Sequence, residues 1–276
     1  MYTAVQLTRH ITVIQGITRE KMFLVTGEKE ACLVDAGLGY GRLDRFVSDL
    51  TRLPLTVLLT HGHLDHTGGS FLFSRVYLHH ADEELFYTSY SPAAAYHYWK
   101  EVRGADPTGN VSAASFCERT PVALRFYAPG QEFDLGGVTL RVLPCAGHTR
   151  GSVAILVCED RLLITGDACN PATYLFFDES ETVDAYRKNL LRLKQQEEAW
   201  DRLLFSHYEV MGLKSTLTEV IRVCEDVLRG EDDAQPFAFG DSRALIAKRI
   251  SSQETMERFD HKQGNIVYSP NKKRNQ

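Results

Sequence analysis

Three histidines and one aspartate stand close together in the segment Thr60-His61-Gly62-His63-Leu64-Asp65-His66. The segment ends an apolar run over residues 54–61 that is typical of a fully buried strand. Gly62 favours a turn there, and ligand sites in α/β architectures prefer such strand ends. Imidazoles packed this closely would share protons or repel one another at mild acidity. A bound metal ion removes that conflict, so the segment predicts a metal site rather than a chance polar turn.

Three more candidate ligands occur further along the chain, each just after an apolar strand. His148 lies in the sequence CAGHTRG, Asp167 in LLITGDA and His207 in RLLFSHY. Taken singly, each is more typical of an ordinary turn or surface residue. Taken with the histidine-rich segment, their common position at strand ends predicts that they complete a metal centre.

Hydrophobic periodicity gives the order of the elements. It predicts strands at 11–16, 21–27, 31–37, 54–61, 75–79, 122–127, 131–134, 137–144, 152–158, 161–166 and 201–207. Helices are expected at 41–51, at two or three places within 80–119, at 181–198 and at 215–229. Short gaps between the first three strands indicate antiparallel hairpins. The order suggests two mixed sheets packed face to face with helices outside.

Two helices carry predicted buried faces, whereas the last part of the chain has no clear pattern. The faces consist of Leu43, Phe46, Val47 and Leu50, and of Tyr186, Leu190, Leu191 and Leu193. After Gly230 the composition becomes acidic and irregular, and no element is assigned there. The length of 276 residues fits one domain over 1–276, with a helical insert at about 80–120 and a C-terminal elaboration at about 230–276.

Charge and cysteine usage exclude several classes of protein. The net charge is -5, and the basic run Lys272-Lys273-Arg274 is expected to be a solvated tail, so no nucleic-acid partner is predicted. The six cysteines form no CxxC pair, which argues against a disulfide framework. We find no export signal and no apolar stretch of membrane-spanning length. A cytoplasmic protein without a membrane partner is therefore expected. Cys169 is expected to be a packing residue rather than a nucleophile.

The histidine and aspartate pattern resembles that of the metallo-β-lactamase-fold superfamily, the αβ/βα sandwich hydrolases. The family pattern is HxHxDH, then a histidine in a GHT turn, then an aspartate after a strand, then a later histidine. This chain matches it from about residue 10 to residue 210. The resemblance implies a four-layer αβ/βα sandwich of two mixed sheets with helices outside, and a metal-dependent hydrolase.

The resemblance also implies a role for each candidate ligand. His61, His63 and His148 would hold one metal ion, and Asp65, His66 and His207 a second, with Asp167 bridging both. Asp35, at the end of the run CLVDAG, matches an aspartate that orients the loops and histidines of such sites. Metal-bound histidines generally need such outer hydrogen-bond partners.

The mechanism implied by the resemblance uses a hydroxide that bridges two divalent ions, most simply zinc, although iron or manganese also suits these ligands. Asp65 is the candidate for handling the proton of the leaving group. Oxygen-reducing relatives carry a glutamate at the position of His63, which favours hydrolysis over an iron-dependent oxidoreductase or dioxygenase. A degenerate module that keeps its metals for structure is a further alternative.

The substrate class predicted is a small-molecule ester, thioester or lactone. A phosphodiesterase or nuclease of the same fold is the alternative, although no nucleic-acid-binding arm is evident. The helical insert contains several aromatic residues that could line an apolar pocket. They could instead pack the insert onto the domain or serve a homo-oligomer. These residues are Tyr96 and Trp99, with Phe86, Tyr87 and Tyr98. Tyr174 resembles a tyrosine that assists carbonyl binding in some lactonases, and Tyr208 is a further pocket candidate.

Overall fold

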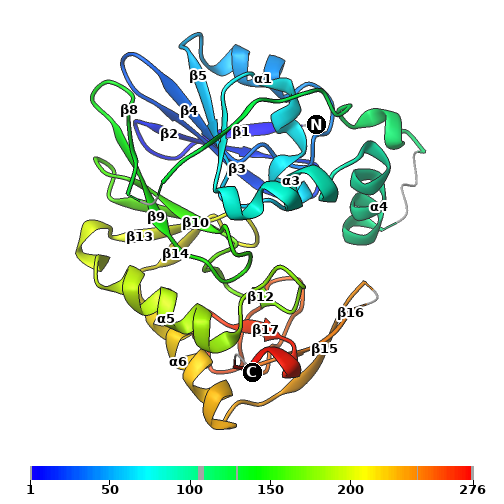
Figure 1. Ribbon diagram of the computed structural model, residues 1–276, viewed down its shortest axis with the longest axis vertical. Coiled ribbons are helices and arrows are strands. Elements are labelled where there is room, and N and C mark those ends of the chain that lie inside the picture. Colours follow the sequence, from blue (N-terminus) through cyan, green and yellow to red (C-terminus); the bar gives the residue numbers. More distant parts are fainter. Residues whose placement is uncertain (1, 105–108, 129, 241, 275–276) are drawn as a thin grey trace. The chain divides into compact units, whose positions relative to one another are not determined.

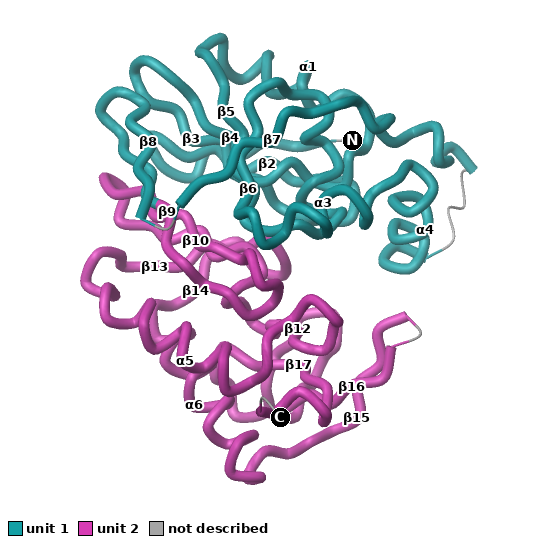
Figure 2. Tube along the Cα trace, in the orientation of Figure 1, with its two compact units in different colours: residues 1–141 teal, residues 142–276 magenta. Residues whose placement is uncertain are grey.

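The computed structural model describes residues 2–104, 109–128, 130–240 and 242–274. Two compact units divide the chain, residues 1–141 and residues 142–276 (Figure 2). Each unit has a hydrophobic core of its own among the described residues, and each carries part of the predicted metal-ligand set.

A mixed sheet in the order β1-β2-β3-β4-β5-β6-β7 forms the centre of unit 1 (Figure 1). Its strands are β1 (Thr3–Gln6), β2 (Ile11–Gln15), β3 (Lys21–Thr26), β4 (Ala31–Val34), β5 (Leu55–Leu58), β6 (Val76–Leu78) and β7 (Leu124–Phe126). β1 to β4 pair antiparallel, which confirms the predicted hairpins, whereas β4 to β7 pair parallel. β8 (Glu132–Asp134) pairs antiparallel with the first residues of β9 (Thr139–Pro144).

The helices of unit 1 are α1 (Leu43–Leu50), α2 (Leu64–Thr67), α3 (Glu83–Ser89) and α4 (Pro92–Arg103). α1 buries Leu43 and Val47, but Leu50 is 41% exposed, so its predicted burial is wrong. Leu50 is the last residue of α1, and the chain turns into extended backbone at Thr51. α3 and α4 confirm helices within 80–119, of which residues 105–108 lie outside the described residues.

Unit 2 contains two sheets (Figure 1). The first has the order β14-β13-β11-β10-β9, with β10 (Val153–Val157), β11 (Leu162–Gly166), β13 (Arg202–Phe205) and β14 (Met211–Leu213). The second has the order β12-β17-β16-β15, with β12 (Thr173–Leu175), β15 (Gln235–Phe239), β16 (Ser242–Ile246) and β17 (Ile266–Tyr268). β15, β16 and β17 lie after Gly230, where the sequence pattern assigned no element.

α5 (Val183–Lys194) and α6 (Ser215–Arg229) pack against one another in unit 2. α5 begins where the Thr182 side chain accepts a hydrogen bond from the Ala185 N–H, a standard N-terminal cap. Its buried stripe contains Tyr186, Leu190 and Leu193, but Leu191 is 37% exposed, so that part of the predicted face is wrong. Leu191 directly follows the buried Leu190 in the chain, so its side chain points to the outer side of the helix.

The basic run near the C-terminus is docked rather than solvated, which corrects the prediction. The Lys272 ammonium donates hydrogen bonds to the carbonyl oxygens of Phe177, Asp178 and Ser180. Lys273 lies over the Tyr268 ring, and Arg274 donates to the Leu228 carbonyl. The loop carbonyls of 177–180 need donors, and a lysine supplies three from one atom.

The remaining expectations concern cysteines and membrane spans. Cys169 is completely buried in the core of unit 2, and burial raises the pKa of its thiol, as a packing residue requires. Within the described part of the chain, no helix has both the length and the apolar character needed to cross a bilayer.

Candidate metal centre

Unit 1 carries the histidine-rich segment on the loop between β5 and α2. β4 and β5 are parallel, with Val34 beside Leu58, so the residues that follow both strands emerge at the same edge of the sheet. Asp35 follows β4 there, and Thr60 and His61 follow β5. The residues that follow each strand therefore form one side of a polar cluster, as expected for the carboxyl ends of parallel strands.

Asp35 connects the two sides of this cluster. Its carboxylate accepts hydrogen bonds from the Thr60 N–H at 2.7 Å, from the Thr60 hydroxyl at 2.9 Å and from His66 Nδ1 at 2.8 Å. Asp35 has φ +61°, in the left-handed region that aspartate tolerates better than most residues. The side chain is buried, so these contacts fix the loop without competition from water.

The hydrogen bonds of His66 and His61 settle their tautomers. A carboxylate only accepts, so His66 carries its proton on Nδ1, facing Asp35. The Thr60 hydroxyl donates to Asp35 and lies 3.0 Å from His61 Nδ1, which therefore donates to the hydroxyl oxygen. In both rings Nε2 is then the unprotonated nitrogen, the form in which imidazole binds a metal ion.

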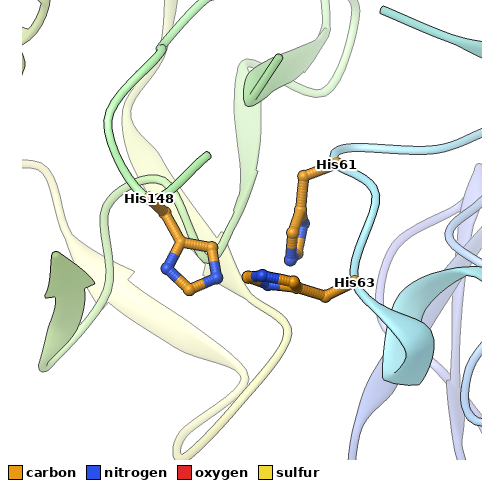
Figure 3. Close-up of side chains that lie close together, drawn as sticks. All are labelled: His61, His63 and His148. Atoms are coloured by element: carbon orange, nitrogen blue, oxygen red, sulfur yellow. The ribbon is translucent and has the colours of Figure 1, made fainter. Parts of the chain in front are cut away.

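Gly62 lets the loop pass close to the helical insert. Its N–H donates to the Asp82 carboxylate at 2.9 Å, and a Cβ at this position would lie 3.1 Å from Asp82 and Leu85. The rings of His61 and His63, both drawn in Figure 3, meet edge to face. Their centroids are 4.9 Å apart. The His61 and His66 rings are 4.1 Å apart. The loop thus gathers the predicted ligands of unit 1 in one place.

Tyr98 on α4, one of the candidate pocket residues of the insert, contacts this group directly. Its hydroxyl donates to Asp65 Oδ2 at 2.7 Å. Its neighbours behave differently, because Trp99 is buried in the core of unit 1 and Tyr96 stacks on Trp99 at 5.8 Å. Phe86 is also buried in that core. No sequence signal separates Tyr98 from the other aromatic residues of the insert.

Unit 2 brings together its own three predicted ligands. β11 and β13 are parallel, with Gly166 beside Phe205, so Asp167 and His207 emerge at neighbouring strand ends. Asp167 Oδ2 lies 3.4 Å from His207 Nε2 and 3.7 Å from His148 Nε2. His148, drawn in Figure 3, lies in the turn after β9.

The turn that carries His148 is fixed on both sides. His148 Nδ1 donates to the Tyr174 carbonyl at 2.8 Å, which again makes Nε2 the unprotonated nitrogen. The Ser180 hydroxyl donates to the His148 carbonyl at 2.7 Å. A Cβ on Gly147 would lie 2.0 Å from the Tyr186 ring, so only glycine lets the turn pack against α5.

The separations between ligand atoms within each unit lie in or slightly above the range of shared metal coordination. Zinc binds imidazole nitrogen and carboxylate oxygen at about 2.0–2.2 Å, so two ligands of one tetrahedral ion lie about 3.3–3.6 Å apart. Asp167 lies 3.4 and 3.7 Å from its two histidines, and His66 Nε2 lies 3.9 Å from Asp65 Oδ2. These separations exceed an ordinary hydrogen bond. All seven predicted ligands belong to histidine and aspartate groups that could hold a metal ion.

Tyr174 and Tyr208, the predicted carbonyl-binding and pocket residues, lie together in unit 2. Their hydroxyl oxygens are 3.4 Å apart. Burial raises the pKa of Tyr174 to about 12, and burial also raises the pKa of Tyr208 well above its usual value. Both phenols therefore remain protonated near neutral pH and keep an O–H donor.

Comparisons with known proteins agree with this chemistry. A model of the metallo-beta-lactamase superfamily matches residues 19–207. The acyl-coenzyme A thioesterase MBLAC2 of Homo sapiens is 27% identical over 161 residues, which cover 54% of this chain and 58% of that protein. The chain thus spans little more than half the length of this relative.

Solved structures show the same fold. A metallo-beta-lactamase from Pontibacter korlensis is 16% identical with a TM-score of 0.58, covering 80% of this chain and 98% of that one. The sec-alkylsulfatase Pisa1 from Pseudomonas sp. is 16% identical with a TM-score of 0.62, covering 83% of this chain and 42% of that one. At these identities the likeness concerns the fold alone.

Proposed function

This chain belongs to the metallo-β-lactamase superfamily, and from that premise we propose that it is a binuclear metal-dependent hydrolase of a small-molecule thioester, ester or lactone. The observation that carries the proposal is the position of Asp167 Oδ2 between His148 Nε2 and His207 Nε2. The family pattern assigns these histidines to different ions, and one carboxylate oxygen near both suits a bridging ligand.

The proposed ligands are His61, His63 and His148 for one ion, Asp65, His66 and His207 for the other, and Asp167 for both. When bound, the ions, most simply zinc, would lower the pKa of a coordinated water to about 7 and polarise the substrate carbonyl. Asp35, the Thr60 hydroxyl and the Tyr174 carbonyl hold His66, His61 and His148 in the tautomers that binding requires.

The chain's own groups would perform the remaining tasks. Asp65, which accepts a hydrogen bond from the Tyr98 hydroxyl, would pass a proton to the leaving group. Tyr174 and Tyr208 would offer O–H donors to the carbonyl oxygen, on which negative charge develops during attack. Tyr96 and Trp99 remain candidates for the pocket wall contributed by the insert. A thioester is favoured among the three substrate types because the human relative is named a thioesterase.

The test is a substrate panel run on the wild type and on Asp167→Ala. The panel contains an acyl thioester, a lactone, a β-lactam and bis(p-nitrophenyl) phosphate. We expect the thioester or lactone to be hydrolysed, and kcat/KM to fall at least about a hundredfold in Asp167→Ala, because loss of a direct ligand exceeds the usual effect of an outer partner.

Asp201→Ala serves as the matched control. Asp201 lies on the surface of the same unit in an ion pair with Arg161, and its removal should change kcat/KM by less than about twofold. Turnover that survives in Asp167→Ala contradicts the bridging role. Hydrolysis of the phosphodiester alone would assign the chain to phosphodiester chemistry instead.

A further inference from the structure

A contiguous group of aromatic rings lies beside the ligands of unit 2. We call it the aromatic wall; it consists of Tyr174, Phe176, Phe177 and Phe239, with Phe237 beneath. The Tyr174 ring lies 5.2 Å from Phe176, 5.7 Å from Phe237 and 5.4 Å from Phe239. Phe176 and Phe177 are 4.3 Å apart. These separations are those of directly packed aromatic pairs.

The wall adjoins a predicted metal ligand at two points. The Phe177 ring meets the His148 ring edge to face at 5.8 Å. The carbonyl of Tyr174, one residue of the wall, accepts the Nδ1 proton of His148. A group attached to a carbonyl held beside His148 would therefore lie within reach of these rings.

The strands that carry the wall come from opposite edges of one sheet. β12 and β15 are separated by β17 and β16, so they would lie about 14 Å apart in a flat sheet. Contact between Tyr174 on β12 and Phe239 on β15 indicates that the sheet curls and turns one face inward. Phe237 and Phe239, two residues apart on β15, present their rings to that same face.

The wall is only partly covered by the protein. Phe237 is buried at its base, whereas Tyr174, Phe176, Phe177 and Phe239 each keep part of their surface exposed. Single exposed aromatic residues are common, but contiguous partly exposed ones mark a binding surface. Lys272 fixes one end of the wall, because its ammonium is bonded to the Phe177 carbonyl.

We propose that the aromatic wall binds an apolar acyl group of the substrate. This proposal rests on the proposed function and narrows it, because it makes the preferred substrate a thioester or ester with a long apolar acyl chain rather than an acetyl group. The wall is formed by apolar ring faces, and each completely buried methylene of a chain packed on them would contribute about a fourfold gain in binding.

The experiment compares octanoyl and acetyl thioesters of the same thiol. In the wild type, kcat/KM for the octanoyl thioester should exceed that for the acetyl thioester. In Phe239→Ala and Phe176→Ala this ratio should fall about tenfold, because the chain loses an aromatic surface. Phe126→Ala is the control, since Phe126 is a 45% exposed phenylalanine on β7 and should leave the ratio unchanged.

Calorimetric titration with octanoate and acetate separates this proposal from the proposed function. Octanoate binding that is weakened in Phe239→Ala, in a protein that hydrolyses no thioester, ester or lactone, supports acyl binding by the aromatic wall and overturns the proposed hydrolase. If the enzyme hydrolyses thioesters with the same octanoyl-to-acetyl ratio of kcat/KM in the wild type and in the wall variants, the aromatic wall does not bind the acyl group. An unchanged ratio, with a dimer that Phe239→Ala dissociates in ultracentrifugation, would make the wall a self-association surface instead.

Discussion

At the scale of single residues, the predicted ligands of unit 1 depend most on the hydrogen bonds that Asp35 accepts. It accepts hydrogen bonds from Thr60 on one loop and from His66 at the start of α2. Neither partner is a neighbour of Asp35 in sequence. Its effect on metal binding would be indirect, through the orientation and tautomer of His66.

We expect Asp35→Asn to weaken binding of the second ion about tenfold to a hundredfold. Asparagine tolerates the left-handed backbone at this position, so the change removes the carboxylate without adding backbone strain. Competition with a chromophoric chelator measures the affinity. Asp44→Asn on α1, which removes an exposed ion pair with Arg42, should bind metal as the wild type does. Equal affinities for Asp35→Asn and wild type would show that Asp35 has no orienting role.

For single residues, the sequence identifies the candidate metal ligands better than it identifies the hydrogen bonds that hold them in position. His61, His63, Asp65 and His66 could be recognised because their density has few structural explanations. Tyr98 could not be selected, because its bond to Asp65 depends on the packing of α4 rather than on any local pattern. The docking of Lys272 could not be predicted for the same reason, since its carbonyl partners lie more than ninety residues away in the chain.

At the scale of elements, parallel strand pairs explain why distant residues meet. β4 with β5, and β11 with β13, each place two polar residues at one sheet edge. β5 and β11 were predictable because they lie in continuous apolar runs, and α6 was predictable from its helical periodicity. β12 and β17 have three residues each, which is too short for a periodic pattern to appear. No periodic pattern therefore indicated these two strands of the sheet that carries the aromatic wall.

The loop between β12 and α5 depends on the docked C-terminal segment. Lys272→Met removes the charged donor that serves three carbonyls of this loop. We expect the free energy of unfolding to fall by about 1–2 kcal/mol, as measured by urea titration. The loop also contains Ser180, which holds the His148 carbonyl, so the variant should bind metal more weakly as well.

Lys262→Met is the control for this prediction. Lys262 forms a surface pair with Glu219 at 3.6 Å, and such pairs contribute little to stability. Its unfolding free energy should stay within about 0.5 kcal/mol of the wild type. If Lys272→Met unfolds at the same urea concentration as the control, the docked segment does not stabilise the loop.

At the scale of the whole molecule, each compact unit assembles part of the ligand set by itself. Unit 1 holds four of the seven proposed ligands and unit 2 holds three: His61, His63, Asp65 and His66, then His148, Asp167 and His207. The fold of the family was predictable because the ligand pattern and the order of elements agree. The single domain over 1–276, the cytoplasmic location and any homo-oligomer stay predictions.

Metal content is the measurement that tests the binuclear assignment most directly. Purified wild-type protein, reconstituted with zinc and freed of excess metal, is analysed by inductively coupled plasma mass spectrometry. Seven histidine and aspartate donors with a bridging carboxylate predict about two zinc ions per chain, with thioester hydrolysis that a chelator abolishes. One zinc per chain after reconstitution, or a single iron per chain with oxygen consumption in the protein as purified, would contradict it.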